Sequence, residues 1–125
     1  MVLIDANYII RLFSQDEDRH YQESKNFFEK VAKKEVEVIV SEGVLMECFF
    51  VLKRVYKYTK DEIIEMLMSI LELQNVANED KAVLIYTLNI LKKHNIDFID
   101  ALLCAKANFY GYEVRSFDKD IQKCL

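Results

Sequence analysis

The segment Val2-Leu3-Ile4-Asp5-Ala6-Asn7 opens the chain with three apolar residues, an acid and then an amide. A short apolar run that ends at a polar turn is typical of a buried β-strand. Three further segments have the character of strands, namely Val36–Val40 (VEVIV), about Leu71–Ala77 and about Tyr112–Phe117. The stretches between them carry apolar residues at helical spacing, which predicts the order β-α-α-β-α-α-β-α-α-β.

Long helical connections between consecutive strands imply a parallel sheet with helices on both faces. We therefore expect an α/β fold, a three-layer α/β/α sandwich around a short parallel sheet. The chain has 125 residues, of which 52% are apolar, enough for one sizeable core. The absence of proline and the presence of only two glycines leave no typical linker. The sequence predicts a single domain over residues 1–125.

The net charge of −4 argues against a protein that holds nucleic acid by charge alone. No apolar run approaches the roughly 20 residues needed to span a bilayer. The N-terminus also lacks the basic segment and long apolar stretch of a signal peptide. We expect a cytoplasmic protein that does not engage a membrane.

The cysteines, Cys48, Cys104 and Cys124, are odd in number and widely spaced, with no C-x-x-C pair. With only two histidines as further ligands, this pattern predicts neither a disulfide framework nor a zinc site. Cys48 and Cys104 lie in apolar runs, where a reduced cysteine packs as a small hydrophobic residue.

Four acids map to one edge of the predicted sheet, because helices in such folds begin where the strands end. Asp5 ends the first strand, and Glu47 lies in the first turns of the helix after the second. Asp100 lies in the first turn of the helix before the fourth strand, and Asp118 follows that strand. If the first and fourth strands are neighbours, these carboxylates converge where open α/β sheets bind ligands.

Each acid also has an ordinary structural role: Asp5 and Asp118 as turn residues, and Asp97 as a helix cap with Asp100 in the first turn. Glu47 and Asp100, however, interrupt apolar stretches that should face the core. A carboxylate there costs several kcal/mol unless it is paired or bound to a metal. The sequence therefore favours a metal site.

Carboxylates without histidine or cysteine suit Mg²⁺ or Mn²⁺. Such ions activate water and stabilise charge on the oxygens of a phosphodiester. Without the four acids, the remaining acidic and basic residues are equal in number. The acidity of the chain therefore does not imply an acidic surface around the site.

The ordered blocks of the chain resemble the PIN domain family. The blocks are Asp5-Ala6-Asn7, Glu47 within SEGVLMECFFVL, Asp97-Phe98-Ile99-Asp100-Ala101-Leu102-Leu103 and Ser116-Phe117-Asp118-Lys119-Asp120. The resemblance implies a Mg²⁺- or Mn²⁺-dependent ribonuclease with Asp5, Glu47, Asp100 and Asp118 as catalytic metal-site acids. It assigns supporting roles to Asn7, Asp97 and Ser116.

Many small members of the family are VapC-like toxins, each held inactive by a partner antitoxin. We accordingly expect the toxin of a type II toxin-antitoxin pair, which cleaves RNA without a covalent intermediate and leaves a 5′-phosphate and a 3′-hydroxyl. The family usually has Thr where this chain has Ser116, and often a further strand after it. The chain ends at Leu125, so we expect a homodimer in which a partner subunit covers the sheet edge.

Candidate phosphate contacts are Arg11, Lys53, Arg54, Lys57 and Lys119. Arg54 is the best placed, because it follows Glu47 by seven residues and so lies on nearly the same helix face. The ordinary alternative for Lys53 and Arg54 is a solvated helix end with cations near its C-terminus.

Other functions find less support in the residues. A haloacid-dehalogenase-type phosphatase needs D-x-D after the first strand, where this chain has Asp5-Ala6-Asn7, and a phosphoacceptor receiver domain needs an acidic pair there. The open alternatives are a catalytically idle PIN-like module that binds RNA or protein, and a solitary RNA-processing nuclease.

Overall fold

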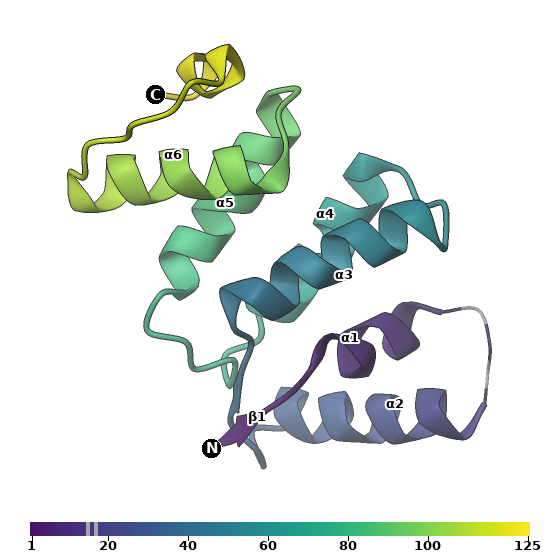
Figure 1. Cartoon of the computed structure of the whole chain (residues 1–125). Coiled ribbons are helices and arrows are strands. Elements are labelled where there is room, and N and C mark those ends of the chain that lie inside the picture. The colour runs from purple at the N-terminus through teal and green to yellow at the C-terminus, as the bar shows by residue number, and fades with distance from the viewer. Residues whose placement is uncertain (15, 17) are drawn as a thin grey trace. The chain divides into compact units, whose positions relative to one another are not determined.

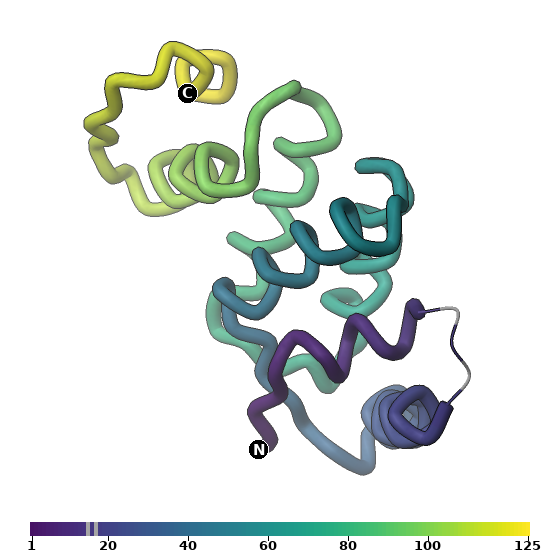
Figure 2. The backbone as a smooth tube through the Cα atoms, turned by 45° about the vertical axis from the view of Figure 1, so that its right-hand side comes forward, coloured from purple at the N-terminus to yellow at the C-terminus, as the bar shows by residue number. Residues whose placement is uncertain are grey.

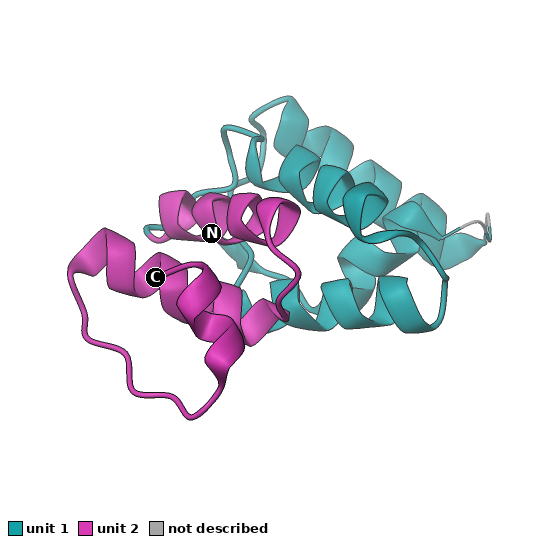
Figure 3. Ribbon diagram, turned by 90° about the horizontal axis from the view of Figure 1, so that it is seen from above, with its two compact units in different colours: residues 1–79 teal, residues 80–125 magenta. Residues whose placement is uncertain are grey.

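The computed structural model describes residues 1–14, 16 and 18–125 (Figure 1). Its contacts divide the chain into two compact units, residues 1–79 and residues 80–125 (Figure 3).

The first unit contains a short parallel sheet of β1 (Val2–Leu3) and β2 (Val38–Ile39). Val2 pairs with Val38, and Leu3 pairs with Ile39. The prediction of a small parallel sheet is confirmed for the first two strands, although each is shorter than its apolar segment. Ile4 is buried directly after β1, so the chain enters the core just before Asp5.

The third predicted strand, Leu71–Ala77, is reduced to a single parallel bridge between Val38 and Val76. Asparagine side chains extend the contact beside that bridge. Asn78 accepts a hydrogen bond from the Val40 N–H at 2.9 Å and donates to the Val40 carbonyl, while Asn75 donates to the Val36 carbonyl at 3.1 Å. Side-chain amides thus take the place of strand backbone, which explains why no regular ladder forms here.

The helices of the first unit begin at polar residues that the sequence supplies at the right positions. Asp5, Asp18, Ser41 and Thr59 each accept a hydrogen bond from a backbone N–H in the following first turn, and Thr59 forms a complete capping box with Glu62. The helices are α1 (Ala6–Phe13), α2 (Arg19–Ala32), α3 (Glu42–Arg54) and α4 (Lys60–Leu71).

Helix α1 packs against α2 on one side and α3 on the other, and α3 packs against α4 (Figure 1, Figure 2). The apolar faces of these helices supply fully buried side chains, among them Ile9, Leu45, Leu52 and Ile63. Burial of each such side chain contributes about 1.5–3 kcal/mol. This packing fixes the start of α1, where Asp5 lies.

The second unit is built from α5 (Lys81–Lys93), α6 (Phe98–Tyr110) and the 3₁₀ helix η1 (Lys119–Lys123). Helix α5 packs against α6. Gly111 caps the end of α6, and its φ of 73° suits a residue without a side chain. The chain then turns back, and η1 lies against α6, with Ile121 buried (Figure 1).

The prediction of a fourth strand over Tyr112–Phe117 is wrong. Within the described residues this segment pairs with no strand, and its side chains are exposed except for half-buried Val114. Glu113 and Arg115 form an ion pair at 2.7 Å on the surface. A strand needs a pairing partner and a buried face, and this alternating polar segment has neither in the described part of the second unit.

The expectation that the cysteines form no disulfide is also wrong. Cys104 on α6 is bonded to Cys124, 20 residues later, because the return of the chain after Gly111 brings the two together. Cys48 is free and buried, as predicted for a small hydrophobic residue. No helix in the described ranges combines the length and the apolar character needed to cross a membrane.

The contacts of Asn78 predict a measurable loss of stability. Asn78→Ala removes both side-chain partners of the backbone of Val40, a fully buried residue, and should lower the free energy of unfolding by about 1–3 kcal/mol. Urea denaturation measures the change. Asn26→Ala, at an exposed position of α2, is the control and should stay within about 0.5 kcal/mol of the parent. Equal effects of the two substitutions would contradict the proposed role of Asn78.

Candidate metal centre

Asp5 lies between β1 and the first turn of α1. Its backbone is extended, with φ −91° and ψ 176°, and its carboxylate accepts a hydrogen bond from the Tyr8 N–H at 3.4 Å. The residue is exposed. Asp5 therefore caps α1 while its carboxylate keeps access to solvent.

Glu47 lies in the second turn of α3 and is exposed. The expectation that it faces the core is wrong, because α3 buries the neighbouring residues Leu45 and Cys48 instead. Its carboxylate is therefore available to a ligand without the cost of desolvation.

A hydrogen bond of Cys48 links the part of α3 next to Glu47 to the start of α1 next to Asp5. The Cys48 thiol donates to the Ala6 carbonyl at 3.6 Å, which joins the residue after Glu47 to the residue after Asp5. Burial, then the charge of Glu47 and to a smaller extent that of Asp5, raises the pKa of the Cys48 thiol to about 12. Both carboxylates thus act on one buried sulfur, and that thiol is unsuited to nucleophilic chemistry at neutral pH.

Asp100 lies in the first turn of α6 and is 8% exposed, so the prediction that it faces the core is confirmed. Asp97 caps the helix and accepts a hydrogen bond from the Asp100 N–H at 3.0 Å, as its ordinary structural role required. Burial raises the pKa of the Asp100 carboxyl, and the charges of Asp97, Asp118 and Asp120 and a hydrogen bond with Asp118 raise it further. Burial and the neighbouring acids therefore all disfavour the ionised form of Asp100.

Asp118 caps η1, and its carboxylate accepts a hydrogen bond from the Asp120 N–H at 2.9 Å. The Asp118 N–H in turn donates to the Ser116 hydroxyl at 3.0 Å. These two local bonds set the direction of the Asp118 side chain, which shares a hydrogen bond with Asp100. In the second unit, then, the structure brings Asp97, Asp100, Ser116 and Asp118 together.

In the first unit, Asp5 and residues of α1 and α2 line a cavity of about 290 Å³. Asn7 and Arg11 are among the residues named from the sequence that line it. His20 and Glu23 also line it and had no signal in the sequence, because their approach depends on how α1 packs against α2.

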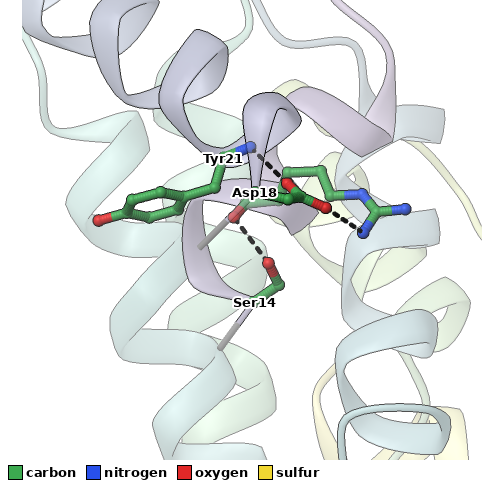
Figure 4. A network of polar contacts seen from close by, with 4 residues as sticks. Ser14, Asp18 and Tyr21 are labelled. Atoms are coloured by element: carbon green, nitrogen blue, oxygen red, sulfur yellow. Dashed lines mark hydrogen bonds and ion pairs between the residues drawn. The ribbon is translucent and has the colours of Figure 1, made fainter. Parts of the chain in front are cut away.

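Ser14, Asp18 and Tyr21 belong to a small polar network where α1 ends and α2 begins (Figure 4). The Arg11 guanidinium lies 3.9 Å from the Asp18 carboxylate, and the Arg11 carbonyl accepts a hydrogen bond from Ser14 at 2.9 Å. The Tyr21 N–H donates to Asp18 at 3.0 Å, and this bond, with the charge of Arg11, lowers the pKa of Asp18. The end of α1 is thereby tied to the start of α2.

Lys53 and Arg54 form the exposed last turn of α3. The Lys53 ammonium lies 6.0 Å from the Phe49 ring centroid, and the Arg54 guanidinium lies 5.4 Å from that of Phe50. Both cations therefore have the helix-end position of their ordinary role, and Arg54 stands about 10 Å along the helix from Glu47. Lys119 begins η1 and is exposed.

The chemistry of these acids fits a hard divalent cation. Their donors are carboxylate oxygens, and the crowding of negative charge at Asp100 would be relieved by a cation. Within residues 1–14, 16 and 18–125, no three His, Cys, Asp or Glu side chains form a group that could hold a metal ion. The structure thus defines two pairs of acids, Asp5 with Glu47 and Asp100 with Asp118, each within its own unit.

Comparison with known proteins identifies the family of the chain. The model of the PIN domain family matches residues 2–124. A curated VapC ribonuclease from Aquifex aeolicus (strain VF5) is similar at 30% identity over 126 residues, which cover 98% of this chain and 91% of that protein. No solved structure matches the chain significantly. With nearly its whole length matched, the chain belongs to the PIN domain family.

Proposed function

We propose that the protein is an endoribonuclease dependent on Mg²⁺ or Mn²⁺, and that Asp5, Glu47, Asp100 and Asp118 hold one or two of these ions. The observation that carries the proposal is the buried Asp100 carboxyl, which is surrounded by other acids in a chain of the PIN family. Crowding of like charges without a partner destabilises a fold, so its presence favours a bound cation. The relative named VapC ribonuclease supports the choice of RNA as substrate.

The residues around Asp100 and Asp118 would have distinct roles in this function. Asp97 fixes the start of α6 and so the position of Asp100, while Ser116 fixes the turn that carries Asp118. Asp100 and Asp118 act on each other closely enough to raise the pKa of the Asp100 carboxyl, so both side chains could contribute oxygens to one cation. When bound, the ion would lower the pKa of coordinated water and stabilise charge on the phosphate oxygens.

One of the four acids would then orient the attacking water on the scissile phosphate. In-line attack leaves a 5′-phosphate and a 3′-hydroxyl, with no covalent intermediate on the protein. Phosphates of the flanking RNA would contact basic side chains, for which we propose Arg11, Lys53, Arg54 and Lys119. Asn7 would support the Asp5 side, because both residues line the same cavity.

We further propose that the protein is the cytoplasmic toxin of a type II toxin-antitoxin pair, neutralised by an antitoxin protein and assembled as a homodimer. The similarity to a VapC ribonuclease over nearly all of both chains supports this role. The match of one family model to residues 2–124 likewise supports one three-layer α/β/α domain over residues 1–125.

A catalytically idle PIN-like binding module is the second candidate. It is favoured by the absence, among the described residues, of three grouped acid, cysteine or histidine side chains that could hold a metal. A solitary RNA-processing nuclease would share the chemistry proposed here and would differ in having no antitoxin.

Metal-dependent cleavage separates the first two candidates. Purified protein should cut structured RNA in Mg²⁺ or Mn²⁺ and stop in excess EDTA, and Asp100→Asn should reduce the rate on the order of a hundredfold or more. Gel analysis of the RNA fragments and of their 5′ ends measures both effects. Asp61→Asn, at an exposed position in α4, is the control and should cut like the parent. Cleavage that persists in EDTA would sink the mechanism.

A second prediction uses stability, so it does not depend on knowing the RNA target. Because the pKa of Asp100 is raised in the folded state, its contribution to stability is present below the ordinary Asp pKa and is lost as pH rises through the raised value. At neutral pH in EDTA, the charge on the buried Asp100 carboxylate lowers the stability of the folded state, and Asp100→Asn removes that charge. The variant should therefore melt several degrees higher than the parent. Thermal denaturation monitored by circular dichroism measures the shift.

Added Mg²⁺ should reverse the order of the two proteins. The parent should gain stability in millimolar Mg²⁺, because a ligand of the folded state stabilises it by mass action, and Asp100→Asn should gain less. Asp61→Asn should follow the parent in both conditions. If Asp100→Asn is less stable than the parent in EDTA and responds equally to Mg²⁺, Asp100 serves only the helix start.

A third prediction concerns Arg54 and RNA affinity. Arg54→Ala should weaken RNA binding measured in EDTA and reduce the slope of log affinity against log salt by about one, as for one lost phosphate contact. Lys30→Ala, a matched cation in the last turn of α2, should leave the slope unchanged. Equal slopes for parent and Arg54→Ala would leave Arg54 as a solvated helix-end cation.

A further inference from the structure

The Cys104–Cys124 disulfide joins the two parts of the second unit that carry Asp100 and Asp118. Cys104 follows Asp100 by four residues on α6, so the two lie one helical turn apart. Cys124 follows Asp118 by six residues, just after η1. The bond therefore closes a loop that contains Ser116 and Asp118 and fastens its far end to the helix of Asp100.

The two cysteines differ in access. Cys104 has no exposed surface, whereas Cys124 is half-buried and lines a cavity of about 440 Å³. The other side chains of this cavity come from α5 and its end, namely Tyr86, Asn89, Ile90, Lys93 and His94. Exposed Lys93 places a positive charge at the cavity, which favours an anionic solute beside Cys124.

The surroundings of the sulfur atoms also suit the reduced state. Both Sγ atoms lie 3.5 Å from the Ile121 carbonyl oxygen, so either thiol, once formed, has a hydrogen-bond acceptor at hand. The Ile121 side chain is fully buried and would keep η1 near α6 without the covalent bond. Opening the disulfide would thus loosen the segment without unfolding the unit.

We propose that Cys124 is a thiol–disulfide exchange site for small anionic thiols, and that opening the bond weakens cation binding by Asp100 and Asp118. The exchange site stands on the disulfide and the cavity alone. The effect on the cation rests on the proposed function.

The exchange consumes two small thiols for each disulfide opened. The thiolate of the first attacks Cys124 Sγ, the bond to Cys104 breaks, and Cys104 leaves as a thiolate that takes a proton from water. A second small thiolate then attacks the sulfur of the first, which releases the oxidised small disulfide and leaves Cys124 as a thiol. The protein disulfide gains two electrons, and the two small thiols lose them.

The covalent tether holds Asp118 close to its partner before any cation arrives. Interactions that hold a metal ligand in position commonly change metal affinity about 10–100-fold. The oxidised protein should therefore bind Mn²⁺ about tenfold more tightly than the reduced protein. The site would then be more active under oxidising conditions.

The charge preference is tested by the rate of reduction with glutathione, which is anionic, and with cysteamine, which is cationic. Thiol counting after denaturation follows the reaction, with one thiol in the oxidised protein and three in the reduced protein. Lys93→Gln should slow glutathione about threefold relative to cysteamine, since it removes the charge at the cavity. Lys92→Gln, the neighbouring exposed lysine that does not line the cavity, should leave the ratio unchanged.

An unchanged ratio in Lys93→Gln, or the same change in Lys92→Gln, would overturn the cavity as the docking place of the thiol. Three free thiols after incubation with oxidised glutathione would overturn the exchange site altogether.

The effect on the cation is tested by calorimetric titration of Mn²⁺ into oxidised protein, reduced protein and Cys104→Ser/Cys124→Ser, with amide hydrogen exchange of residues 112–124 in parallel. The proposal expects slower exchange and about tenfold tighter Mn²⁺ binding in the oxidised protein, with the double variant matching the reduced protein. Equal exchange and equal affinity in both states would overturn the inference. Redox-dependent exchange without Mn²⁺ binding in either state would overturn the proposed function and leave the thiol site standing.

Discussion

The buried carboxylate of Asp100 is the constraint on which the candidate site depends. It sits in the first turn of α6, where the helix dipole favours negative charge, yet burial and three nearby acids oppose its ionisation. The dipole favours the charged form of Asp100, whereas burial and the neighbouring acids disfavour it, and the latter effects prevail because the pKa of the carboxyl is raised. In the function proposed here, a divalent cation would supply the compensating charge, and carboxylates are the donors that Mg²⁺ and Mn²⁺ prefer.

The first unit prepares its own pair of acids in a different way. The β1–β2 pairing brings Asp5 to the end of a strand, and the thiol of Cys48 ties α3 to the start of α1, so that Glu47 shares the same surroundings. Both of these carboxylates are exposed, and neither needs a cation for its own stability. The two pairs thus differ: Asp5 and Glu47 are exposed to solvent, whereas Asp100 is buried beside Asp118 and other acids.

Local sequence signals were sufficient for the first two strands and for the start of α6. Asp97, predicted as a helix cap, does cap that helix. The strand predicted over Tyr112–Phe117 failed because alternation alone cannot supply a pairing partner. The predicted orientation of Glu47 failed because the apolar run around it is longer than the buried stripe of α3. The disulfide and the approach of His20 to Asp5 depend on chain reversal and helix packing, which no spacing in the sequence encodes.

The central proposal is that Asp100 and the acids beside it bind a divalent cation, and calorimetric titration of Mn²⁺ tests it most directly. Titrations of the parent, Asp100→Asn and Asp61→Asn compare the loss of the buried acid with the loss of an exposed one. We expect Asp100→Asn to weaken Mn²⁺ binding about tenfold or more, whereas Asp61→Asn should bind like the parent. Equal Mn²⁺ affinity in all three proteins, or no binding to the parent, would contradict a metal site at Asp100.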